Sequence, residues 1–155
     1  MTENRAREGQ FLITVYRNGK LFRQDLVKNI VTDTALDAEI DILIGTVPDL
    51  QIKYAAFGTD NTAPTAGDTI LGSESGRFVP STAFANTGTG VVSGNFRLTS
   101  SDLVGVAIEE IGIYCGAAAT AAADSGTLMS RILWSFSKTA ADEVDIVRTD
   151  TVARA

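Results

Sequence analysis

Two β-prone segments flank a turn pair near the N-terminus. They form FLITVYRNGKLFRQDLV, residues 11–27, with Asn18 and Gly19 between them. Asn-Gly suits a type I′ turn because both residues tolerate a positive φ. The pattern therefore predicts a β-hairpin over 11–27.

One segment changes to a helical period, TALDAEIDILIG, residues 34–45. Its large apolar residues recur at i, i+4, i+7 and i+8, which places them on one face of a helix: Leu36, Ile40, Leu43 and Ile44. Thr34 followed by Asp37 resembles a capping box, and Gly45 and Pro48 end the segment. We expect one short amphipathic helix over about 34–45.

The remaining apolar segments are short and are separated by polar turns at intervals of roughly ten residues. Such spacing favours a mainly β fold, either a β-sandwich or a partly open barrel. Pro80 suits an edge or bulged strand, and the alanine-rich segment 116–126 is interpreted as a flexible hairpin tip in which a short helix is possible. The predicted strands are IKYAAFG (52–58), RFVPSTAFA (77–85), GVVSGNFRLT (90–99), AIEEIGIYC (107–115), TLMSRILWSFSK (127–138) and EVDIVRTDTV (143–152).

Residues 1–9 are polar and charged, with Met1 as the one large apolar residue. We interpret them as an N-terminal arm that precedes a single β-rich domain over 10–155. The arm lacks apolar surface to offset its loss of backbone entropy, so we expect it to order only against another subunit. There it would extend a sheet edge, with Arg5 and Arg7 paired to acidic neighbours.

Composition narrows the classes of partner. The 155 residues suit one domain, and the net charge of −6 argues against nucleic acid and against an anionic membrane surface as partners. No apolar run approaches the ~20 residues of a membrane span. The first residues, MTENRAREGQ, lack the apolar centre of a signal peptide. These features predict a protein that is made and folded in the cytoplasm.

Catalytic and metal-binding residue sets are scarce. The chain has no histidine and one cysteine, Cys115, which excludes a Ser-His-Asp triad, an internal disulfide and a cysteine-based zinc site. The loop within residues 54–74 contains Asp60, Asn61 and Asp68, but not the spacing of an EF-hand or a phosphate loop. We interpret it as a connection in which Asp68 caps a short helical turn.

The adjacent carboxylates Glu109 and Glu110 form the best acidic pair, yet neighbours in a strand point to opposite faces. A structural ion pair is therefore favoured over acid–base catalysis. The candidates for such pairs are Glu74, Arg77, Glu110 and Arg131, with Arg97 a further possible partner of Glu110. Cys115, Trp134 and Phe136 are expected in the core. No cofactor motif is found, so we predict no metal, no cofactor and no enzymatic activity.

The order of these parts resembles a family of small virion structural proteins of tailed bacteriophages, of the tail-fibre or tail-associated type. The resemblance covers roughly residues 26–138 and depends on LVKNIVTDTAL, IKYAAFGTDNTAPTAGDTILGSE, EEIGIYCG and TLMSRILWSFSK. It implies a structural role without catalysis. The acidic helix and the charged N-terminal segment depart from the family pattern and leave the place in the virion open.

The leading hypothesis is thus a tail- or fibre-associated virion component or adaptor. Its partners would be other virion proteins, in a homo-oligomer or a symmetric multi-copy array. A head decoration protein that stabilises the capsid is one alternative. Another is a glycan-binding β-sandwich, for which the candidate aromatic residues are Tyr16, Phe22 and Tyr114.

Overall fold

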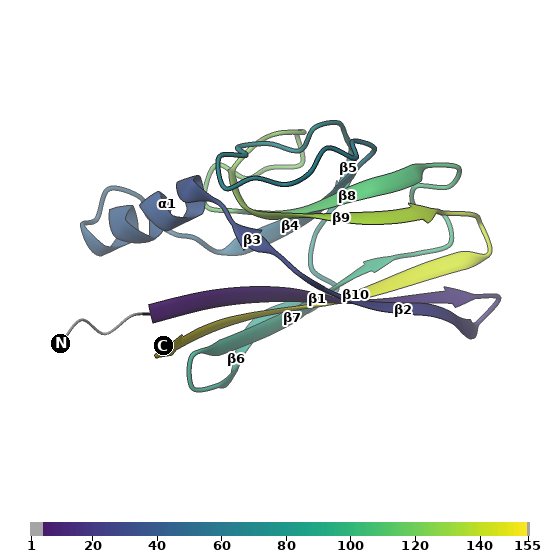
Figure 1. Cartoon of the computed structure of the whole chain (residues 1–155), viewed down its shortest axis with the longest axis horizontal. Helices are drawn as coiled ribbons and strands as arrows, with labels where there is room; N and C mark the ends of the chain where they lie inside the picture. Colours follow the sequence, from purple (N-terminus) through teal and green to yellow (C-terminus); the bar gives the residue numbers. More distant parts are fainter. Residues whose placement is uncertain (1–4, 155) are drawn as a thin grey trace.

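The computed structural model describes residues 5–154, and the side chains of residues 7–152. Two antiparallel five-stranded sheets pack face to face, with one helix at one end of the sandwich (Figure 1). The predicted mainly β fold with one short helix is therefore confirmed, as a sandwich and not a closed barrel.

The first sheet has the strand order β2-β1-β10-β7-β6, and the second has the order β3-β9-β8-β4-β5. The bounds of the first sheet are β1 (Arg5–Arg17), β2 (Lys20–Lys28), β6 (Thr82–Gly88), β7 (Val91–Leu98) and β10 (Asp142–Arg154). The bounds of the second sheet are β3 (Ile30–Val31), β4 (Ile52–Gly58), β5 (Glu74–Phe78), β8 (Ala107–Cys115) and β9 (Thr127–Ser137). Helix α1 (Asp33–Leu43) connects β3 to β4.

The N-terminal hairpin forms as its turn residues predict. Asn18 has φ 50° and Gly19 has φ 75°, the positive values that a type I′ turn requires. After the hairpin the chain passes from the first sheet to the second at Asn29, whose side-chain oxygen accepts a hydrogen bond of 2.6 Å from Arg148. Arg148 is fully buried and bonds bidentately to Asp150, at 2.9 and 2.6 Å. A buried guanidinium is tolerated here because it is paired and hydrogen-bonded.

The inner faces of the two sheets share one core. Cys115, Trp134 and Phe136 lie in it as predicted, and burial raises the pKa of the Cys115 thiol to about 12. The pairing of β8 with β9 shifts register between Ile108 and Glu110, where β9 contributes one residue more than β8. Ile108 and Ile111 both lie in the core, so the side chains of β8 do not alternate strictly across this shift.

The predicted N-terminal arm is wrong for residues 5–9. These residues begin β1, which pairs with β10 from Arg5↔Arg154 onward, so they belong to the domain. The side chain of Arg7 forms an ion pair with Glu39 of α1 and donates to Met129 Sδ, so its contacts lie within the same chain. Residues 1–4 and the side chain of Arg5 lie outside the described part of the chain.

Helix α1 begins at Asp33, one residue earlier than expected. Thr32 is the N-cap, and its hydroxyl accepts a hydrogen bond of 3.2 Å from the N–H of Ala35. The predicted capping box at Thr34 and Asp37 is therefore wrong, since both residues lie inside the helix. Gly45 follows the C-terminal end with φ 76°, as a helix-ending glycine does.

The turn before β10 generates a prediction about pH. The Asp142 carboxylate accepts from Arg17 Nε at 2.7 Å and from both the N–H and the hydroxyl of Thr139 at 2.8 Å. The hydrogen bond from Arg17 is the main reason why the pKa of Asp142 falls to about 2. A lowered pKa stabilises the fold above the ordinary value near 3.8, and that contribution is lost as the pH falls towards about 2.

We therefore expect Asp142→Asn to lower the free energy of unfolding by about 1–2 kcal/mol at neutral pH, because Arg17 is partly exposed and solvent screens the pair. Urea unfolding at several pH values should show this difference shrinking below pH ~4. Asp145→Asn is the control, since Asp145 pairs with the exposed Arg97 at 3.8 Å. A difference that stays constant down to the acid limit would contradict the assignment.

Candidate functional site

The outer face of the second sheet is covered by two loops, residues 59–73 and 116–126. Each is fastened by an ion pair among the residues that the sequence singled out. The structure brings Glu110 together with Arg131, and Glu74 together with Arg77, while Arg97 pairs elsewhere with Glu143. The hydrogen bonds of these paired groups show whether their side chains are available for chemistry or only hold the loops on the sheet.

Glu110 is fully buried, and its carboxylate is surrounded by donors. It accepts from Arg131 Nε at 2.7 Å and from the backbone N–H groups of Gly72 and Ser73 at 3.0 and 2.8 Å. Gly58 lies against the carboxylate, where a β-carbon would collide with it. A carboxylate whose oxygens are already bonded and shielded from solvent holds a loop in place, and we assign this role to Glu110.

The other acids of loop 59–73 are partly exposed, and they too accept hydrogen bonds. Asp68 accepts from the N–H of Thr65 at 3.0 Å and from Arg131 at 3.2 Å, and Asp60 accepts from the N–H of Thr62 at 2.7 Å. No helical turn follows Asp68, so its predicted capping role is wrong. Among the residues with described side chains, no group of three His, Cys, Asp or Glu could hold a metal ion.

Arg77 fastens the second loop. Its guanidinium bonds Glu74 at 2.6 and 2.8 Å, donates to the carbonyl oxygens of Thr120 and Ser125, and lies 4.4 Å from the ring centre of Tyr114. Residues 116–126 contain no helix and form turns around these donors. The expected flexible tip is thus a loop with defined anchors.

The aromatic candidates for glycan binding do not gather into one site. Tyr114 is fully buried on the outer face of the second sheet, where its hydroxyl accepts from the N–H of Leu71 at 3.0 Å. Burial raises its pKa to about 12. Tyr16 and Phe22 lie in the first sheet, and the ring of Phe22 is covered by the Arg17 guanidinium 3.9 Å away.

Helix α1 presents an unexpected surface. Large apolar residues of the helix and its C-cap Ile44 point to solvent, with 45% of Leu36, 59% of Ile40, 80% of Leu43 and 69% of Ile44 exposed. The helix packs on the second sheet through the small residues Ala35 and Ala38 instead. The helical period predicted that these apolar residues share one face, but not that this face points to solvent. We call Leu36, Ile40, Leu43 and Ile44 the α1 stripe.

Acidic residues border the α1 stripe on one side. Asp33, Asp37 and Asp41 follow one another at intervals of four, so they form a row along the helix. Glu39 lies on the other side and pairs with Arg7. Within the described residues, no helix is long and apolar enough to cross a membrane. The surface is therefore apolar with a negative border, at one end of the sandwich (Figure 1).

Comparisons with protein family models, with curated proteins and with solved structures find no match to this chain. We therefore identify the candidate site from the geometry of this chain. The loops over the second sheet are fixed by buried ion pairs, whereas the α1 stripe is exposed and has no partner within the described residues. We take the α1 stripe as the candidate functional site.

The role assigned to Glu110 leads to a testable change. Glu110→Gln removes the nearer of the two carboxylates that pair with buried Arg131, and we expect a loss of about 3–5 kcal/mol in the free energy of unfolding. Faster hydrogen exchange should appear at the amides of Gly72 and Ser73, which lose a charged acceptor.

The adjacent carboxylate provides the matched control. Glu109 is partly exposed and has one hydrogen bond, from the hydroxyl of Ser135. Glu109→Gln should change the free energy of unfolding by no more than about 0.5 kcal/mol. Equal effects of the two substitutions in urea unfolding would show that Glu110 does not hold the loop.

Proposed function

We propose that this protein is a non-enzymatic structural component of a tailed-bacteriophage particle, and that it attaches to a different particle protein through the α1 stripe. One observation carries the attachment: α1 buries its two alanines, while the four apolar side chains of the α1 stripe are exposed. Exposed apolar clusters of this kind mark interaction surfaces.

The energetics of the α1 stripe suit an interface. Full burial of an Ile or Leu side chain contributes about 1.5–3 kcal/mol. Leu43 and Ile44 are the most exposed members, so a groove that covers them gains the most from them. Association itself costs several kcal/mol. A stripe of this size therefore supports modest single contacts, which many copies in one particle strengthen by avidity.

Charge indicates the kind of partner. Asp33, Asp37 and Asp41 border the α1 stripe, and the whole chain carries a net charge of −6. Pairing with the same helix of a second copy would bring acidic rows close together, which is unfavourable. An apolar groove bordered by Lys or Arg on another protein complements both features. In this proposal, the symmetry of the particle positions the copies in an array, and the α1 helices of different copies do not contact one another.

The assignment to a phage particle is supported by the resemblance over residues 26–138. On the same ground we propose a tail- or fibre-associated position, with head decoration as the alternative. The exposed stripe is compatible with either place, because both require attachment to a larger assembly. Locating the chain in an imaged intact particle distinguishes the two.

The α1 stripe can be tested by substituting two of its residues. Ile40→Gln together with Leu43→Gln removes apolar surface while retaining residues that tolerate a helix. We expect about tenfold less of this variant in purified particles, measured by quantitative mass spectrometry. Its melting temperature should remain close to that of the wild type, since both side chains are largely exposed.

The matched control is Leu21→Gln with Leu26→Gln, two leucines of β2 that are 65% and 61% exposed. This variant should enter particles normally. Normal incorporation of the helix variant would exclude the α1 stripe as the attachment surface. Absence of the wild-type chain from particles would instead exclude the particle assignment.

A further inference from the structure

Strand β4 has an open edge at its N-terminal end. Its pairing with β5 begins at Ala55↔Phe78, so residues 52–54 extend beyond the end of β5. After Phe78 the chain leaves the second sheet through Val79 and Pro80 and enters β6 of the first sheet. The position beside residues 52–54, in line with β5, has no strand from the described part of the chain.

Backbone groups of this edge point away from the sheet. The N–H of Gly116 donates to the carbonyl of Gln51 at 3.0 Å, and Ile52 lies opposite Cys115 in β8. In an antiparallel ladder this arrangement directs the N–H and C=O of Ile52 away from β8, towards the open side. Within the described residues, no backbone hydrogen bond joins 52–54 to Val79 or Pro80. Pro80 also has no N–H to donate.

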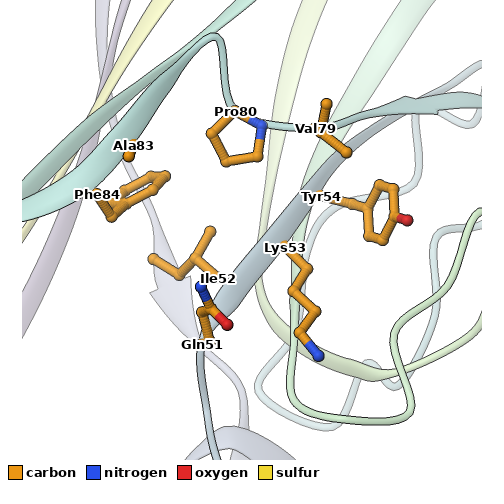
Figure 2. A pocket seen from close by; sticks show the side chains of 8 residues that line it. All are labelled: Gln51, Ile52, Lys53, Tyr54, Val79, Pro80, Ala83 and Phe84. Carbon is orange, nitrogen blue, oxygen red and sulfur yellow. The ribbon is translucent and has the colours of Figure 1, made fainter.

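A groove of about 440 Å³ lies beside this open edge. Figure 2 shows Ile52 extending from β4 towards Phe84, with Pro80 and Val79 on the facing segment. Lys53 and Tyr54 extend to the other side of the strand. Lys53 is the one charged residue among those that line the groove.

We propose that an extended segment of another protein binds here as an added strand, in line with β5. Its backbone pairs with the N–H and C=O of Ile52, alternate apolar side chains enter the groove, and an acidic side chain meets Lys53. An unpaired strand edge selects polypeptide over a small molecule, because only a backbone offers alternating donors and acceptors at strand spacing. This inference goes beyond the proposed function and uses a surface distinct from the α1 stripe.

Selection from a displayed library of random octapeptides on the purified protein tests the proposal. We expect the selected peptides to contain an acidic residue among alternating apolar ones. Their synthetic forms should slow hydrogen exchange of the Ile52 amide, since that group gains an acceptor. Binding is measured by fluorescence polarisation.

Three variants identify the site. Lys53→Glu reverses the charge beside the groove, and Ala83→Trp fills the groove. Each substitution should weaken binding about tenfold or more. Lys28→Glu is the control, because it makes the same change of charge on an exposed lysine of β2. All three variants should fold as the wild type does, since these side chains are at least partly exposed.

Several outcomes would overturn the proposal. One is that no peptide is enriched over a selection without protein. Another is that the selected peptides bind Lys53→Glu and Ala83→Trp as tightly as they bind the wild type. A third is self-association of the purified chain that Ala83→Trp abolishes, which would assign this edge to a second copy instead of another protein.

Discussion

The carboxylate of Glu110 organises one face of the molecule. It is buried, so it requires donors, and it obtains them from Arg131 and from the backbone of loop 59–73. Closing that loop over the sheet brings the chain back along β4 as β5. The length of β5 in turn determines where the edge of β4 becomes open. The contacts of one buried side chain thus connect the core with the loop that leads into β5.

Helix α1 shows how small residues can determine which side of a helix faces the solvent. Ala35 and Ala38 let the helix lie close to the second sheet, and the hydroxyl of Thr32 connects its first turn to the carbonyl of Leu128 as well as to Ala35. Large residues on that side would hold the helix away from the sheet. The large apolar residues are therefore left outside, where they gain from burial only in contact with another molecule.

Local patterns predicted much of the fold. The strands at 52–58 and 107–115 form within their predicted bounds, and Asn18-Gly19 makes its turn, because β-prone segments and turn residues act over a few positions. Long-range contacts were harder to predict. Residues 5–9 resemble an arm until β10 lies beside them, and three arginines could have met Glu110 until the register placed Arg131 opposite Gly112.

The candidate site was predicted in part. The four residues of the α1 stripe follow from the helical period, yet a period does not say which side packs when alanines occupy the other face. The register shift between β8 and β9 was missed for a related reason, since it depends on how the two strands pair and not on the sequence of β8 alone. The open edge of β4 depends on where a neighbouring strand ends, which the sequence of β4 itself does not contain.

The pairing of β1 with β10 has a practical consequence for labelling. Because these strands are antiparallel from Arg5↔Arg154, both ends of the described chain emerge at the end of the sandwich that carries α1 (Figure 1). An affinity tag or fluorescent domain fused at either terminus would stand beside the helix and obstruct whatever approaches it. The turn at Asn18 and Gly19 lies at the opposite end, so a small label inserted there leaves the helix accessible.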